Sequence, residues 1–245
     1  MALVHEFERS GNWLFKRRSW LPVVLIIAGI IVLYLTNRQA ILFDSTEELI
    51  LLGLSLFGEA IRIYTVGYAP RNTSGRNTVA GQIADELNTT GIYSLVRHPL
   101  YLGNFFMWIG PVLFVRTFVF VIIFILVYGL YYERIMFAEE QFLRGKFGEA
   151  YDKWSENVNA IIPRFKGFIK PSISFSFKSV LKREYNSFAN IFLIFVALDL
   201  FRNYFVSERI YITPLWMYIG IPAGLIWVAV RLIHKKTSWL ENTGR

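Results

Sequence analysis

The stretch GIYSLVRHPLYLGN at Gly91–Asn104 joins a polar loop directly to a long apolar segment, Leu100–Val115. Only two residues separate this segment from the next apolar one, Phe118–Phe137. Crossing the roughly 30 Å hydrocarbon core of a bilayer takes about 20 helical residues, so the two segments predict a tight antiparallel hairpin of membrane helices. Arg97 and His98 stand at the mouth of that hairpin. Two such polar residues at the end of an apolar hairpin indicate a polar site at the membrane surface.

The composition indicates a membrane protein. The chain of 245 residues is 54% hydrophobic and 17% aromatic, with a mean hydropathy of +0.41. This apolar content is too high for an ordinary soluble domain. The sequence has no cysteine, which excludes disulfides, thiolate metal sites and cysteine nucleophiles. Lys16-Arg17-Arg18 precede an apolar run that lacks a small-residue cleavage site, so we expect the first apolar segment to be retained.

Hydropathy predicts an all-α, polytopic membrane protein that forms a single integral domain over residues 1–245. Six segments are expected to cross the membrane: Trp20–Leu35, Leu49–Val66, Leu100–Val115, Phe118–Phe137, Phe188–Val206 and Ile212–Ile233. An even number of crossings puts both termini on the same side.

The distribution of basic residues predicts which side that is. On the six-span arrangement, all but four of the 26 Lys and Arg residues lie at the face that holds the termini and the long loops. The four others are Arg38, Arg116, Arg202 and Arg209. Positive loops are retained in the cytoplasm, so both termini are predicted to be cytoplasmic. The same loops account for the net charge of +8, and we expect no nucleic-acid partner.

Two long segments lie on the predicted cytoplasmic face. The first, residues 67–97, contains Arg71 and Arg76 beside hydroxyl and amide side chains, which can bind phosphate or carboxylate oxygens. We take these two arginines as candidates for substrate binding, with a solvated positive loop as the alternative.

The second segment, residues 138–187, begins as a helix that leaves the membrane. Apolar and acidic side chains recur there at helical spacing: Tyr132, Met136, Glu139 or Glu140, Leu143 and Phe147. The carboxylates are therefore expected on the same face as packing residues.

Two charged pairs fall inside predicted spans. Glu59 and Arg62, like Asp199 and Arg202, are three residues apart, which lets each pair neutralise itself on a helix. Charges inside a membrane are costly, so a functional role is the first hypothesis. Self-pairing is a sufficient structural explanation for Asp199 and Arg202. Glu59 and Arg62 lie just before the polar loop, and we take them as candidate catalytic residues that shape a headgroup pocket.

The motif RHPLYLG at Arg97–Gly103, preceded by Gly91-x-Tyr93, resembles the RHPxYxG signature of the isoprenylcysteine carboxyl methyltransferase-like integral membrane methyltransferases. The block EEQFLRGKFGEAYDKW at Glu139–Trp154, followed by Ile162-Pro163, is similar to the second block of that family. The resemblance covers residues 93–163 and implies a methyltransferase core there. Residues 1–92 and 164–245 would then be substrate-side and accessory helices.

The resemblance implies binding of S-adenosylmethionine at the cytoplasmic interface, with no metal. By motif position, the cofactor-binding residues would be Tyr93, Arg97, His98, Pro99, Tyr101, Gly103, Glu139 and Glu140. These residue types suit the cofactor: carboxylates accept hydrogen bonds from ribose hydroxyls or the ammonium group, arginine pairs with its carboxylate, and a tyrosine ring contacts the sulfonium. Without the surrounding motif, His98 would be interpreted as a capping or packing residue.

The predicted acceptor is a lipid or lipid-linked group, which follows from the membrane setting and the resemblance. Methyl transfer is an in-line displacement, and a carboxylate or phosphate needs no general base. An amine would first have to lose a proton, to Glu59, Glu133 or His98. The arginines near the site favour an anionic acceptor: Arg62, Arg71, Arg76 and Arg97. A phospholipid amine, which other members of the family methylate, is the alternative.

Two further alternatives remain open. Membrane sterol reductases, which use NADPH, have an Arg-x-x-Tyr-x-Gly-like turn, but His98-Pro99 and the paired glutamates favour a methyltransferase. A channel or transporter would place polar residues across the bilayer or show an inverted repeat, and the sequence has neither pattern. The oligomeric state is left open.

Overall fold

The computed structural model describes residues 2–18, 20–36, 44–70, 73, 77–78 and 81–241. Its helices are α1 (Leu3–Lys16), α2 (Trp20–Thr36), α3 (Ser45–Gly67), α4 (Pro99–Phe114), α5 (Phe118–Phe147), α6 (Glu149–Ser155), α7 (Phe177–Ser207) and α8 (Pro214–Lys236). A 3₁₀ turn, η2 (Gly91–Ser94), precedes α4. Two strands of two residues each, β1 (Asn77–Thr78) and β2 (Gly81–Gln82), form an antiparallel pair in the α3–α4 connection. The all-α prediction is confirmed.

Each of the six predicted spans coincides with a helix. Within the described residues, α3, α5, α7 and α8 are long and apolar enough to cross a membrane, and α1 with α2 is a fifth candidate if the two count as one span. Helix α4 is a shorter apolar helix of 16 residues. The chain is therefore a multi-pass membrane protein, as predicted.

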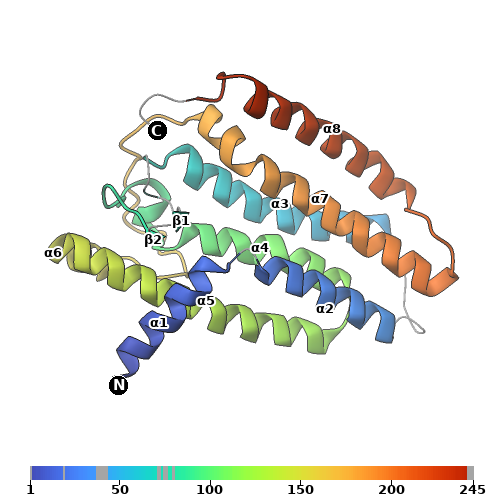
Figure 1. The fold of residues 1–245 in the computed structure, drawn as a ribbon, viewed down its shortest axis with the longest axis horizontal. Helices are drawn as coiled ribbons and strands as arrows, with labels where there is room; N and C mark the ends of the chain where they lie inside the picture. The colour runs from blue at the N-terminus through green and yellow to red at the C-terminus, as the bar shows by residue number, and fades with distance from the viewer. Residues whose placement is uncertain are drawn as a thin grey trace.

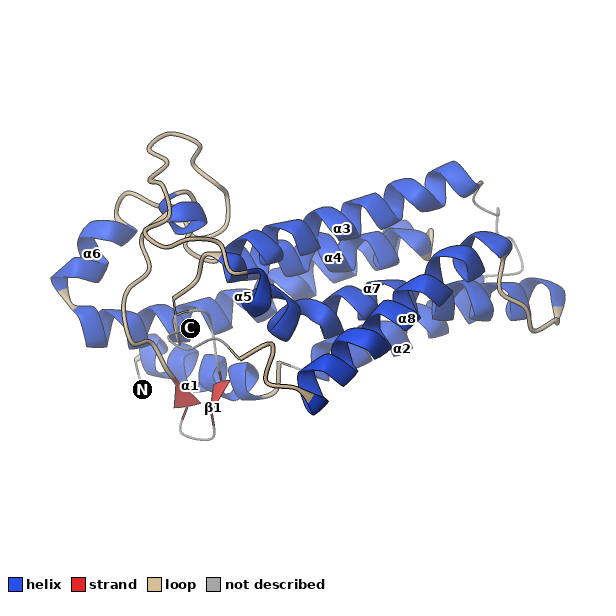
Figure 2. Cartoon of the chain, turned by 90° about the horizontal axis from the view of Figure 1, so that it is seen from above, coloured by secondary structure: helices blue, strands red, loops and turns tan. Residues whose placement is uncertain are grey.

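The long helices lie side by side, and the connections between them alternate from one end of the bundle to the other (Figure 1). One end holds α1, α6, the C-terminal end of α8 and the described parts of the long loops, an arrangement that Figure 2 also shows. We call this the loop end. The six-span prediction likewise puts the two ends of the chain on one side.

Helices α3 and α4 approach closely because small residues face each other. A Cβ atom on Gly103 would lie 2.8 Å from the carbonyl oxygen of Gly58, and one on Gly58 would meet the backbone of α4. Ser55 donates a hydrogen bond to the carbonyl oxygen of Met107, 3.0 Å away. Small and hydroxyl-bearing residues of this kind are typical of packed membrane helices. The structure thus places Gly103, predicted to contact the cofactor, at a helix–helix interface.

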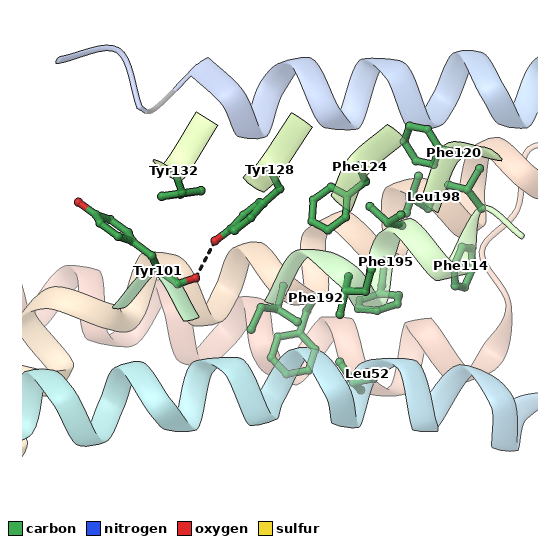
Figure 3. Packing of buried hydrophobic residues seen from close by; sticks show 14 of the residues in the cluster. Leu52, Tyr101, Phe114, Phe120, Phe124, Tyr128, Tyr132, Phe192, Phe195 and Leu198 are labelled. Atoms are coloured by element: carbon green, nitrogen blue, oxygen red, sulfur yellow. Dashed lines mark hydrogen bonds between the residues drawn. The ribbon is translucent and has the colours of Figure 1, made fainter. Parts of the chain in front are cut away.

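The core is a column of aromatic side chains (Figure 3). Tyr101, Tyr128 and Tyr132 lie at its loop-end part, and the hydroxyl of Tyr128 donates to the carbonyl oxygen of Tyr101 at 2.6 Å. Phenylalanines continue the column, and Phe195 stacks on Trp216 with ring centroids 4.8 Å apart. The tyrosines give this core a polar end next to the loops.

At the other end of the bundle, a buried charge cluster joins α3, α7 and α8. Arg202 pairs with Asp199 at 2.5 Å and with Glu48 at 2.8 Å. Glu48 also accepts a hydrogen bond from the indole of Trp216, and Asp199 accepts one from the backbone of Thr213. The predicted Asp199–Arg202 pair is confirmed, and the structure adds Glu48 as a partner.

Two helical segments extend beyond the predicted ones. Helix α7 begins at Phe177, well before the predicted span, and Ser176 caps it by accepting a hydrogen bond from the backbone of Ser179. Helix α1 was not predicted; it packs against α5, with Gly11 next to the carbonyl oxygen of Arg134. Both segments mix polar and apolar residues, so hydropathy does not detect them.

Candidate functional site

A cavity of about 910 Å³ lies at the loop end. Its polar wall consists of side chains from η2, α4, the end of α5 and α6: Tyr93, Arg97, His98, Tyr101, Glu139, Glu140, Tyr151 and Trp154. Its apolar wall comes from α2, α4 and α7: Pro22, Val23, Ile26, Met107, Trp108, Ile191, Leu193, Ile194 and Ala197. The cavity therefore joins a polar chamber to the apolar interior of the bundle.

The chain conformation at the predicted motif is fixed by its neighbours. Gly91 has a φ of +61°, which glycine adopts without strain. Pro99 starts α4, where its missing N–H costs nothing. The backbone N–H groups of Arg97 and His98 donate to carbonyl oxygens of residues 159 and 160, at 2.8 and 3.0 Å. The segment after α6 thus holds the motif at the cavity wall.

Glu140 connects the two predicted motifs. Its Oε1 lies 2.9 Å from Nε of Arg97 and 2.9 Å from Nε2 of His98. Arg97 also donates to the carbonyl oxygens of Ser155 and Val158, at 2.8 and 2.7 Å. Its guanidinium is therefore engaged by one carboxylate and two carbonyls, and it orients Glu140 and the loop after α6.

Glu139 faces the other side of His98. Its Oε2 accepts a hydrogen bond from the hydroxyl of Tyr101 at 2.8 Å, and it lies 3.7 Å from Nδ1 of His98. The imidazole is buried between the two glutamates and stacks on the ring of Tyr101. Both carboxylates are partly exposed toward the cavity and keep acceptor capacity for a ligand.

Two phenols in the polar wall stay neutral. Burial, with a contribution from the charge of Glu139, raises the pKa of the Tyr93 phenol. Burial, followed by the charge of Glu140, likewise raises the pKa of the Tyr151 phenol. The hydroxyl oxygen of Tyr151 is buried and makes no hydrogen bond of ordinary geometry with the described residues. It interacts with the nearby carboxylate of Glu140, and a neutral hydroxyl can also donate a hydrogen bond to a bound ligand.

Arg62 reaches the cavity at the junction between its polar and apolar walls. Its Nε and Nη2 donate to Oε2 of Glu184, at 2.9 and 2.7 Å, and its Nη1 donates to Asn104 at 2.6 Å. The predicted partner Glu59 lies 3.9 Å away. Self-pairing with Glu59 is thus only the weaker interaction of Arg62, and an interhelical bond to α7 dominates.

Glu59 lies behind this junction. It is 1% exposed, does not line the cavity, and has no hydrogen bond to either carboxylate oxygen from the described residues. Glu184 does line the cavity, and sequence reasoning missed it because residues 177–187 were assigned to a loop. The available signal was the helical spacing of Val180, Glu184, Ile191, Phe195 and Leu198, all of which are buried.

The predicted site residues divide into three groups. The cavity brings together Arg62, Tyr93, Arg97, His98, Pro99, Tyr101, Glu139 and Glu140. Glu59 and Gly103 lie outside its lining. Arg71 and Arg76 fall outside the described residues.

Among the described residues, the charges of the cavity wall balance. Four basic side chains line it, Arg18, Arg62, Arg97 and Arg183, and so do four acidic ones, Glu86, Glu139, Glu140 and Glu184. The same part of the chain contains no cluster of three His, Asp or Glu side chains arranged to hold a metal ion. The described wall thus offers hydrogen-bonding and aromatic groups without an excess of positive charge.

Comparison with known proteins agrees with this assignment of the two motifs. Residues 49–150 match the model of a family described as phospholipid methyltransferase. The chain is 37% identical over 78 residues to a protein-S-isoprenylcysteine O-methyltransferase of Schizosaccharomyces pombe. The aligned segment covers 31% of this chain and 33% of that protein. The resemblance to the isoprenylcysteine methyltransferase-like family is confirmed. No solved structure matches the chain.

Two further relatives match longer parts of the chain. A probable protein-S-isoprenylcysteine O-methyltransferase of Oryza sativa is 29% identical over 131 residues, which is 51% of this chain and 68% of that protein. A nickel-cobalt-cadmium resistance protein of Alcaligenes xylosoxydans is 32% identical over 90 residues, or 37% of this chain and 42% of that protein. The chain thus spans about a third of the yeast relative and two fifths of the bacterial one. Helices α7 and α8 lie beyond the family match at residues 49–150.

Proposed function

We propose that this chain is an S-adenosylmethionine-dependent methyltransferase that acts on a lipid or lipid-linked acceptor at the membrane surface. The observation that carries the proposal is the meeting of both family motifs at Glu140, on the wall of a cavity that continues between apolar helices. We further propose that the loop end, with both termini, faces the cytoplasm, because the basic residues gather there.

The donor and acceptor groups of the polar wall fit the cofactor. Glu139 and Glu140 would accept hydrogen bonds from ribose hydroxyls or the ammonium group, and the neutral hydroxyl of Tyr151 would donate to a cofactor oxygen. The rings of Tyr93 and Trp154 supply faces for a cation. When bound, S-adenosylmethionine supplies an activated methyl group on a positively charged sulfur.

The apolar wall suits a hydrocarbon tail. Val23 on α2 and Leu193 on α7 line the cavity and are also 48% and 64% exposed at the bundle surface, where lipid would lie. A lipid-linked acceptor could enter between these helices and present its headgroup near Arg62. A tail that enters from the bilayer stays out of water between these helices, whereas exposing it to water would cost about 0.8 kcal/mol per methylene. The apolar wall therefore suits a lipid better than a water-soluble acceptor.

The chain itself contributes orientation and exclusion of water. Arg97 holds Glu140 and the loop after α6 in place, and Glu140 and Glu139 fix His98 between them. A rigid wall of this kind aligns the acceptor atom with the methyl group, which is the main requirement of an in-line displacement. The surrounding apolar helices keep bulk water from the reacting atoms.

The test is a binding and transfer assay on the purified full chain. S-adenosylmethionine should bind, NADPH should not, and a labelled methyl group should appear in added total membrane lipid. Binding of NADPH without S-adenosylmethionine would favour a reductase, and label only in soluble molecules would overturn the lipid acceptor.

A further inference from the structure

Resting on this proposed function, we propose that Glu184 of α7 selects the acceptor by its headgroup, and that the headgroup carries N–H donors, as a primary or secondary ammonium does. The geometry of Glu184 is the first support. Both hydrogen bonds from Arg62 go to Oε2, so Oε1 has no hydrogen-bond partner from the described residues. Glu184 is 4% exposed and lines the cavity, which leaves Oε1 available to a donor inside it.

The charge around Arg62 is the second support. Arg62 makes three hydrogen bonds, to Glu184 and Asn104, and has Glu59 at 3.9 Å. The summed charge of Arg62, Glu184 and Glu59 is zero if Glu59 is protonated, and it is minus one if Glu59 is ionised. An anionic headgroup would have to displace Glu184 from Arg62, and removing one partner of a buried pair is strongly unfavourable.

The prediction of an anionic acceptor rested partly on Arg62 and Arg97, and in the structure both side chains already have partners. Arg62 is held by Glu184, and Arg97 by Glu140 and two carbonyls. A headgroup with N–H donors needs none of these bonds to break, because it adds a partner to Oε1. The same contact would reject a carboxylate or phosphate through like-charge repulsion.

A chain of polar contacts places this position next to the proposed cofactor wall. Asn104, which accepts from Arg62, donates to the hydroxyl of Tyr132 at 3.2 Å. The ring of Tyr132 lies 4.7 Å from that of Tyr101, whose hydroxyl donates to Glu139. A headgroup nitrogen at Glu184 is thus on the same side of the cavity as the groups proposed to hold the methyl donor.

In this assignment, Glu184 accepts the proton that an ammonium group must lose before it can be methylated. An ammonium headgroup transfers one N–H proton to Oε1 of Glu184, and the freed lone pair on nitrogen forms the bond to the methyl carbon. The carbon–sulfur bond breaks and its electron pair stays on sulfur, which becomes neutral. The methylated nitrogen becomes positively charged as the sulfur becomes neutral. The proton on Glu184 then passes to water.

The experiment compares wild type with Glu184→Gln and Glu184→Asp. Glutamine keeps the size and an acceptor for Arg62 but removes the charge, whereas aspartate keeps the charge. Each protein is incubated with labelled S-adenosylmethionine and vesicles of phosphatidylethanolamine or of phosphatidylglycerol. We expect label in the amine lipid only, a loss of at least tenfold in kcat/KM with Glu184→Gln, and partial recovery with Glu184→Asp.

Cofactor binding and folding are measured on the same samples. Cofactor affinity should stay close to wild type in both variants, and Glu149→Gln, which changes an exposed glutamate on α6, should behave as wild type throughout. Glu184→Gln should lower Tm, because it removes the charge that faces Arg62, and Glu184→Asp should lower it less. Transfer is therefore compared at a temperature at which thermal unfolding shows all the proteins to be folded. Label on a carboxylate or phosphate, or equal amine transfer by Glu184→Gln, would overturn the role of Glu184 while leaving the methyltransferase standing. Absence of cofactor binding and of any transfer by wild type would instead overturn the proposed function.

Discussion

Replacing Arg202 with methionine should destabilise the protein more than any substitution of an exposed arginine. Arg202 is buried and pairs at 2.8 and 2.5 Å with Glu48 and Asp199, which are buried as well. Removing one partner from a buried pair costs about 3–5 kcal/mol, because the remaining charge has no compensation. In a chain of this size each kcal/mol lowers Tm by about 2–4 °C, so the expected decrease is about 6–20 °C.

Thermal unfolding of the detergent-solubilised protein measures this decrease. Arg209→Met is the matched control, since Arg209 is exposed near the same end of the bundle and should leave Tm within about 2 °C. A second variant adds Asp199→Asn and Glu48→Gln to Arg202→Met. It should recover part of the lost stability, because it removes the unpaired charges and keeps amide oxygens as acceptors for Thr213 and Trp216. A decrease below about 2 °C for Arg202→Met alone would refute the reasoning.

The remaining predictions concern the site and the topology. His98→Ala and Glu140→Ala should each reduce S-adenosylmethionine affinity at least tenfold in titrations made at a temperature at which the variants remain folded; unchanged affinity in both would remove this wall from the cofactor site. Reporter fusions should place both termini in the cytoplasm and insertions at Asn37 and Glu208 outside, and an external C-terminus would contradict the orientation. The pKa of the Tyr151 phenol is higher in the folded state than in the unfolded state. The free energy of unfolding that the neutral phenol contributes is therefore fully present below pH of about 10 and decreases as the pH rises above that value. Tyr151→Phe should therefore lose less stability than wild type between pH 9 and 11 in denaturant titrations, and identical losses would argue against the raised pKa.

The sequence predicts the fold well because membrane helices are long apolar runs. The link of two residues between Leu100–Val115 and Phe118–Phe137 was sufficient for the α4–α5 hairpin, which the structure contains. The start of α7 was missed because its first turns carry charges that lower local hydropathy. Helix α1 was missed for a similar reason, since it is amphipathic and lies against α5.

The candidate site was predicted only where its parts are close in sequence or share a known motif. The RHPLYLG and EE blocks converge as expected, at Glu140. The pairing of Arg62 with Glu184 was beyond sequence reasoning, because the two residues are 122 positions apart and local spacing favoured Glu59. The roles of these residues toward cofactor and acceptor stay predictions.

The matched charge clusters of α3 and α7 have a consequence for how the protein enters the membrane. Each helix carries one arginine three residues after its own acid, Glu59 before Arg62 and Asp199 before Arg202, so each can insert with an internal counter-charge. A further acid of each helix, Glu48 in α3 or Glu184 in α7, lies toward its N-terminal end. When the antiparallel helices meet, each terminal acid binds the arginine of the other helix. Sliding by one turn would break both contacts at once, so the two ion pairs favour a single register of α7 on α3.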